Sequence, residues 1–201
     1  MSDHLNVTLH LVALGANSAT SLCANARCLA YATGRLPGRV VARSRLFRTP
    51  AWPPGNGPDF VNAVVLLWAP VPPERLLEKL HRIEARAGRV RGVRWGARVL
   101  DLDLLASGGQ VRPDPATQRR WVALSPERQM RETPSRLILP HPRLQDRAFV
   151  LLPLAEVAAA WRHPVTGRTV AGMAARLPAA ARRDIRPIAA PDGVVNRKRR
   201  S

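Results

Sequence analysis

The segment VLDLDLL, residues 99–105, constrains the fold more than any other part of the chain, because leucine and aspartate alternate along it. A period of two is typical of a β-strand with one face on the hydrophobic core. Three leucines would enter that core: Leu100, Leu102 and Leu104. Asp101 and Asp103 would share the other face, where two neighbouring carboxylates stay ionised only if cationic groups lie opposite them. The strand therefore requires a sheet with one covered face and a second face that carries a charged site.

The apolar pattern also gives the order of the elements in the first half of the chain. Further strands are predicted at 7–14, 39–47 and 60–70. Two helices are predicted between them, one ending at Gly34 and the other, which begins at a pair of prolines, ending at Gly88. The resulting order β-α-β-β-α-β is that of a ferredoxin-like α+β fold, an antiparallel sheet with helices packed on one face.

The second half of the chain is less regular. The predicted segments are a polar insert at about 108–136, a helix begun near Pro153, a short helix at 169–177 and a weak strand at 182–190. We expect one domain over residues 1–189 and a disordered basic tail over 190–201.

Composition narrows the choice of partners and of cellular location. The formal net charge is +18, and only Lys79 and Lys198 are lysines, so the charge comes from arginine, whose planar fork matches phosphate. The sequence contains no run of about 18 uncharged apolar residues, which a membrane-spanning helix would need. The first residues lack the pattern of a signal peptide, so we expect a cytoplasmic protein. Cys23 and Cys28 are expected to be buried, reduced thiols.

The aspartate pair has two interpretations. Residues two apart on a strand have Cα atoms roughly 6.6–6.8 Å apart. That separation suits one hard cation between Asp101 and Asp103, or two cations. The alternative is a solvent-exposed strand face with ion pairs to arginines.

The loop before this strand, GRVRGVRWGAR at 88–98, combines arginines with glycines. Guanidinium groups neutralise phosphate oxygens, and glycines let the backbone move. Next to a carboxylate pair, the pattern favours a triphosphate site, and the alternative is a solvated arginine-rich loop. The chain has no Walker A sequence, so ATP would be bound without a P-loop.

Phe60 and Asn62 share a strand face by the same period of two. An aromatic ring and a carboxamide suit a flat heterocycle with amide-like edges, although a core Phe beside a structural Asn has the same pattern. His141, Arg147 and Phe149 follow in the proline-bounded segment PHPRLQDRAF. Taken alone, a histidine in such a segment favours a structural role.

Four strings together closely resemble the 6-hydroxymethyl-7,8-dihydropterin pyrophosphokinase family of folate biosynthesis. They are LGANSAT, FRTPAWPPGNGPDFVNAVV, RIEARAGRVRGVRWGARVLDLDLL and LPHPRLQDRAFVLLPLAEVA. The resemblance covers about residues 5–177 apart from the insert. It implies transfer of diphosphate from ATP to the pterin hydroxymethyl group with release of AMP. We expect a monomer whose partners are small molecules, with no membrane or nucleic-acid partner.

The resemblance also implies a role for each matching residue. Asp101 and Asp103 would hold two Mg²⁺ ions, which would keep both carboxylates ionised. The catalytic arginines on the phosphates would be Arg89 and Arg98. The residues that help to hold ATP would be Arg91, Trp95, His141 and Arg147. The pterin would lie between Phe60 and Phe149 and form hydrogen bonds with Asn62 and Thr49.

Two other classes of protein share parts of this pattern. A basic ferredoxin-like fold can bind RNA, but the candidate strands lack the aromatic cluster that stacks RNA bases. A metal-dependent nuclease would use an acidic pair, but it would give no reason for the set Phe60, Asn62 and Phe149. AMP release from ATP in the presence of the pterin separates these classes.

Overall fold

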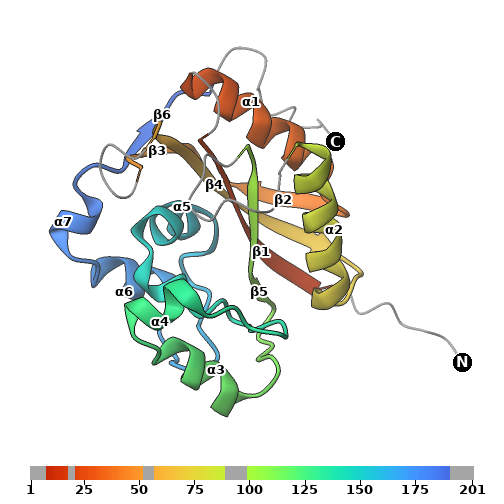
Figure 1. Ribbon diagram of the computed structural model, residues 1–201, viewed down its shortest axis with the longest axis vertical. Coiled ribbons are helices and arrows are strands. Elements are labelled where there is room, and N and C mark those ends of the chain that lie inside the picture. Colours follow the sequence, from red (N-terminus) through yellow and green to blue (C-terminus); the bar gives the residue numbers. More distant parts are fainter. Residues whose placement is uncertain (1–7, 18–20, 52–56, 89–98, 191–201) are drawn as a thin grey trace, which may run out of the picture.

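The structure is a computed structural model that describes residues 8–17, 21–51, 57–88 and 99–190 (Figure 1). Its central feature is an antiparallel sheet in the order β5-β1-β4-β3-β6, in which β2 also pairs with β4. The strands are β1 Thr8–Ala16, β2 Arg39–Arg43, β3 Leu46–Thr49, β4 Phe60–Ala69, β5 Asp101–Ser107 and β6 Arg186–Ile188. All pairings between these strands are antiparallel, which confirms the predicted α+β class.

The helices cover both faces of this sheet, so the prediction that they pack on one face was wrong. Figure 1 shows α1 (Leu22–Thr33) and α2 (Pro73–Arg86) on one side, and α5 (Ala148–Ala158) with α6 (Val170–Ala175) on the other. The reason lies in β4, whose residues on both faces are apolar and buried. Val61, Ala63 and Val65 belong to the cluster under α1 and α2, whereas Val64 belongs to the cluster under α5. A strand that is apolar on both faces needs two covering layers.

The segment predicted as one strand at 39–47 is two strands, β2 and β3, because regular strand pairing is interrupted at Ser44 and Arg45. The Ser44 hydroxyl accepts a hydrogen bond from the Val64 amide at 3.0 Å and donates one to the Arg45 carbonyl at 2.8 Å. The Arg45 amide donates to Glu156 on α5 at 2.8 Å. These contacts satisfy backbone groups that a continuous strand would have paired, so both halves still pair with β4.

Helix α5 begins at Ala148 and not near Pro153, which lies inside the helix. A proline inside a helix removes one hydrogen bond and crowds the preceding turn. The burial of Val150, Leu151 and Leu154 offsets that cost, because all three are almost inaccessible to solvent.

The insert at about 108–136 is not merely a polar connection, because it contains α3 (Pro115–Val122) and α4 (Pro126–Arg131). The side chains of Asp114 and Ser125 cap these helices. The predicted short helix and weak strand are α6 and β6, and α7 (Ala179–Arg182) lies between them. Most of the predicted basic tail, residues 191–201, lies outside the described residues.

The two cysteines of the chain lie on α1 and differ in their exposure to solvent. Both cysteines are free, but Cys23, in the first turn of α1, is exposed, so the prediction that it is buried was wrong. Cys28 is half-buried, and its thiol donates to the Val99 carbonyl at 3.2 Å. Burial raises the pKa of the Cys28 thiol.

None of the helices in the described ranges is long and apolar enough to cross a membrane.

Candidate functional site

A row of four residues crosses the sheet on the side covered by α5. Register places them in the order Asp101, Gly15, Asn62 and Phe47, on β5, β1, β4 and β3. Residues directly opposite each other in antiparallel strands share a face. Because neighbouring strands lie about 4.7–4.9 Å apart, the backbones at Asp101 and Asn62 are separated by roughly 10 Å. The predicted metal residues and pterin residues therefore lie on one surface, a short distance apart.

The predicted pterin residues Thr49 and Asn62 are in direct contact. The Asn62 Nδ2 atom donates a hydrogen bond to the Thr49 hydroxyl at 2.9 Å. Only 7% of Asn62 is exposed, so its carboxamide is held in one orientation by its neighbours. Phe60 pairs with Thr49 at the ends of their strands and is half-buried. The sequence prediction that Thr49, Phe60 and Asn62 act together is consistent with this geometry.

Asp101 and Asp103 share the face opposite the leucine core, as the alternation predicted. Leu100, Leu102 and Leu104 are at most 3% exposed. Both aspartates are half-buried. An Arg147 Nη1 atom lies 3.4 Å from Asp103 Oδ2, so a cationic side chain does lie opposite the pair.

Arg147 and Phe149 enter the site from the start of α5. Arg147 is the N-cap residue of the helix, and Phe149 lies in its first turn. The guanidinium carbon of Arg147 is 5.7 Å from the centre of the Phe149 ring. Burial of the following residues against the sheet fixes the helix, and with it these two side chains, on the face that carries Asp103.

His141 is held beside β5 by its own backbone. Its amide donates to the Leu105 carbonyl at 2.8 Å, and its Nδ1 atom accepts from the Arg143 amide at 3.0 Å. Burial lowers the pKa of His141 to about 3, and the charges of Arg147 and Arg143 act in the same direction, whereas Asp101 opposes them. The imidazole is therefore neutral at neutral pH. With Nδ1 as an acceptor, Nε2 carries the proton and can donate to an anion.

Hydrogen bonds from the insert hold the segment that carries His141 in place. Arg112 and Leu139 exchange two backbone hydrogen bonds, of 2.9 and 3.2 Å. Gln118 on α3 is completely buried, and its Nε2 atom donates to the Pro140 carbonyl at 3.3 Å. Trp121, on the same helix, is half-buried.

Four predicted residues fall on the arginine-rich segment 89–98, which lies outside the described residues: Arg89, Arg91, Trp95 and Arg98. In the sequence this segment lies between α2, which ends at Arg86, and β5, which begins at Asp101 and carries the aspartate pair.

The aspartate pair fits Mg²⁺ better than it fits a metal held by protein ligands alone. Within the described ranges, no group of three or more His, Cys, Asp and Glu side chains could hold a metal ion. Mg²⁺ keeps several waters and is bound by one or two carboxylates together with substrate phosphates. Two half-buried carboxylates on one strand face have the donor chemistry for that mode of binding.

Two residues that position the site were missed by the sequence prediction. Glu84 on α2 is 1% exposed, and its Oε1 atom accepts from the Leu102 amide at 2.7 Å, between the two aspartates. In the described sheet β5 is an edge strand, so this amide has no strand partner on that side. A signal was present, since Glu84 follows Leu80 by four residues on the apolar stripe of its helix. Gly15, the other missed residue, gave no signal beyond its place in LGAN.

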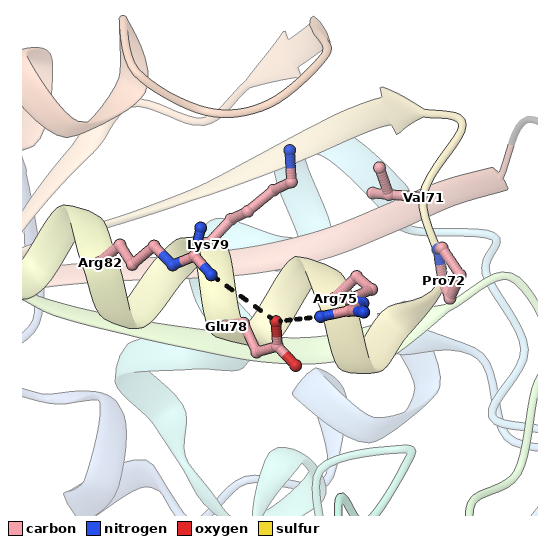
Figure 2. A pocket seen from close by; sticks show the side chains of 6 residues that line it. All are labelled: Val71, Pro72, Arg75, Glu78, Lys79 and Arg82. Atoms are coloured by element: carbon pink, nitrogen blue, oxygen red, sulfur yellow. Dashed lines mark hydrogen bonds and ion pairs between the residues drawn. The ribbon is translucent and has the colours of Figure 1, made fainter.

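A pocket of about 320 Å³ at the start of α2 is separate from this site (Figure 2). One of its lining residues, Glu78, forms ion pairs with Arg75 at 2.9 Å and Arg82 at 4.0 Å. These side chains are exposed to solvent, so the ion pairs contribute little to binding or stability. Helix α2 also packs on the other face of the sheet from Asp101 and Asp103.

Comparisons with known proteins place the chain in a family. The model of the 7,8-dihydro-6-hydroxymethylpterin-pyrophosphokinase (HPPK) family matches residues 11–159. The chain is 44% identical over 124 residues to 2-amino-4-hydroxy-6-hydroxymethyldihydropteridine pyrophosphokinase of Methylorubrum extorquens, covering 61% of this chain and 65% of the relative. It is 38% identical over 128 residues to the protein of the same name from Synechocystis, covering 64% and 52%. The match thus spans less than two thirds of the length of either relative.

A solved structure is also similar. The crystal structure of wild-type Plasmodium falciparum HPPK-DHPS with pteroate has a TM-score of 0.62 and 14% identity, covering 88% of this chain and 43% of that chain. At this level of identity the similarity concerns the fold.

Proposed function

The chain belongs to the 7,8-dihydro-6-hydroxymethylpterin-pyrophosphokinase family, and on this premise we propose that it transfers diphosphate from ATP to the hydroxymethyl group of 6-hydroxymethyl-7,8-dihydropterin, a step of folate biosynthesis. One observation carries the proposal: the hydrogen-bonded pair Thr49–Asn62 and the carboxylates of β5 lie on one face of the sheet, and Gly15 on β1 lies between them. A ligand heterocycle beside Thr49 and Asn62, with a polyphosphate beside the carboxylates of β5, would fit this arrangement.

At the pterin end, Asn62 and Thr49 would form hydrogen bonds with the ring edge, and Phe60 and Phe149 would stack on its faces. The Asn62 carboxamide is held by Thr49, so little side-chain entropy would be lost on binding. Half-burial of both phenylalanines leaves part of each ring available to a ligand.

At the phosphate end, Asp101 and Asp103 would hold two Mg²⁺ ions, which supply charge neutralisation to the ATP phosphates. Arg147, whose Nη1 atom lies 3.4 Å from Asp103 Oδ2, would donate to a phosphate oxygen of ATP. His141 would donate from Nε2 to the nucleotide. By position in the resemblance, Arg89 and Arg98 would neutralise the transferred group, and Arg91 and Trp95 would help to hold ATP.

The proposed reaction needs no protein nucleophile. The hydroxymethyl oxygen would form a bond to the β-phosphorus of ATP, the bond between that phosphorus and the oxygen shared with the α-phosphorus would break, and AMP would leave with that oxygen. The hydroxyl proton would pass to solvent. Such a transfer depends mainly on alignment and on stabilisation of charge, which is what aspartates and arginines supply.

We propose further that the enzyme acts as a monomer in the cytoplasm, where ATP is available, and has no nucleic-acid or membrane partner. The many arginines in the sequence are consistent with polyphosphate as the anionic partner.

Mass spectrometry of the products tests the proposal. With Mg²⁺, ATP and the hydroxymethyl dihydropterin, we expect AMP and the pterin diphosphate in equal amounts. ADP with a pterin monophosphate would contradict the reaction. Cleavage of added RNA or DNA, with no AMP formed, would favour the nuclease interpretation instead.

A further inference from the structure

The strand that separates the two ends of the site has no side chain where it passes between them. Gly15 is buried on β1, with Asn62 opposite it on β4 and Asp101 opposite it on β5. A Cβ atom built at Gly15 would lie 2.9 Å from Asn62 Oδ1. That distance is shorter than real Cβ atoms allow, so a side chain at position 15 and the present orientation of Asn62 exclude each other.

The Asn62 carboxamide has little freedom to avoid such a contact. Its Nδ2 atom is bound to the Thr49 hydroxyl at 2.9 Å, and its side chain has only two rotatable bonds. Movement of Oδ1 away from β1 would therefore rotate Nδ2 away from Thr49. The backbone at Gly15 needs no glycine for its own sake, because it lies in the regular pairing of β1 with both neighbours.

We infer that Gly15 is a positioning residue for pterin recognition: the absence of its side chain lets the Asn62 carboxamide lie across β1 with Oδ1 toward position 15 and Nδ2 on Thr49. The inference rests on the proposed function. It adds that the orientation of the Asn62 donor and acceptor depends on Gly15, a residue on a different strand that has no polar side-chain atom.

Gly15→Ala is the test, with Gly109→Ala as the matched control, because a Cβ at Gly109 meets nothing within 4 Å. Pterin fluorescence titration in the presence of a non-hydrolysable MgATP analogue measures binding. We expect Gly15→Ala to weaken binding of 6-hydroxymethylpterin on the order of tenfold or more, since a misplaced amide leaves polar groups unpaired. Affinity for the MgATP analogue alone, and pterin binding by Gly109→Ala, should change less than about twofold.

A double-mutant cycle separates positioning from general damage. In the Asn62→Ala background there is no Oδ1 to displace, so Gly15→Ala should cause no further loss of pterin affinity. If it still weakened binding tenfold in that background, or left binding unchanged in the parent, the inference would be wrong. If Gly15→Ala alone failed to fold, recovery of folding in Gly15→Ala/Asn62→Ala would establish the conflict between the two residues, and no recovery would refute it.

The titration of the parent protein tests the proposed function separately. Binding by the parent but unchanged binding by Gly15→Ala would overturn the inference and leave the function intact. Absence of pterin binding by the parent would overturn the function and, with it, the inference.

Discussion

Glu84 allows a sharp test of how the aspartate strand is held in place. Its carboxylate is 1% exposed, and its Oε1 atom accepts a hydrogen bond of 2.7 Å from the Leu102 amide. Glu84→Ala leaves that amide unsatisfied in a buried place, which costs about 1–3 kcal/mol. The lost methylene groups and the space they leave add roughly 1 kcal/mol. We therefore expect the free energy of unfolding to fall by about 2–4 kcal/mol.

Two further substitutions on α2 are the controls for the loss of stability expected in Glu84→Ala. Glu84→Gln keeps an oxygen acceptor for Leu102 and has almost the same shape, so it should retain most of the stability that Glu84→Ala loses. Glu78→Ala removes an exposed carboxylate that pairs with Arg75, and such surface pairs contribute about 0–1 kcal/mol. Urea unfolding, followed by tryptophan fluorescence and by circular dichroism, gives all three values. Equal losses for Glu84→Ala and Glu78→Ala would refute the reasoning.

Three further predictions concern the metal pair, a buried histidine and the tail. Asp101→Ala and Asp103→Ala should each reduce single-turnover product formation by about 10³-fold or more without loss of folding, and turnover within tenfold of the parent in both would contradict the metal assignment. Burial lowers the pKa of His163, whose Nδ1 accepts from the Val165 amide at 3.2 Å, so stability should fall as pH drops below about 6.5, by at most ~1.4 kcal/mol per pH unit. His163→Asn keeps an acceptor and should make that dependence less steep in unfolding measured from pH 7.5 to 5, while His10 and His141, whose pKa values burial also lowers, still contribute to it; an unchanged slope would exclude a contribution from His163. Removal of 191–201, which is basic and has no periodic apolar face, should leave the melting temperature and turnover unchanged, and loss of either would show that the tail packs on the domain.

Local pattern was enough for the features that depend on one strand or one helix. The alternation at 99–105 placed three leucines in the core and both aspartates on the other face. The two-residue spacing of Phe60 and Asn62 likewise placed them on a common face.

Features that depend on pairing between strands were not predictable in this way. Gly15 matters because register places it opposite Asn62, and Glu84 matters because β5 has an edge amide at Leu102. Neither register nor strand order follows from periodicity alone. Helices α5 and α6 were predicted, but their place on a second face of the sheet was not, although the apolar residues on both faces of β4 indicated it. The sequence predicted that α5 begins near Pro153, because proline favours the first turn of a helix, whereas the helix begins at Ala148. Burial of the residues around Pro153 outweighs that local preference.

The measurement that tests the account most directly is transfer from a pterin labelled with ¹⁸O in its hydroxymethyl group. In the presence of Mg²⁺ and ATP, the label should appear in the pterin diphosphate, bridging carbon and phosphorus, and the AMP should be unlabelled. That result requires the hydroxymethyl oxygen to attack the β-phosphorus, as a site with pterin and polyphosphate on one sheet face predicts. Loss of the label from the product, or ADP in place of AMP, would contradict the account.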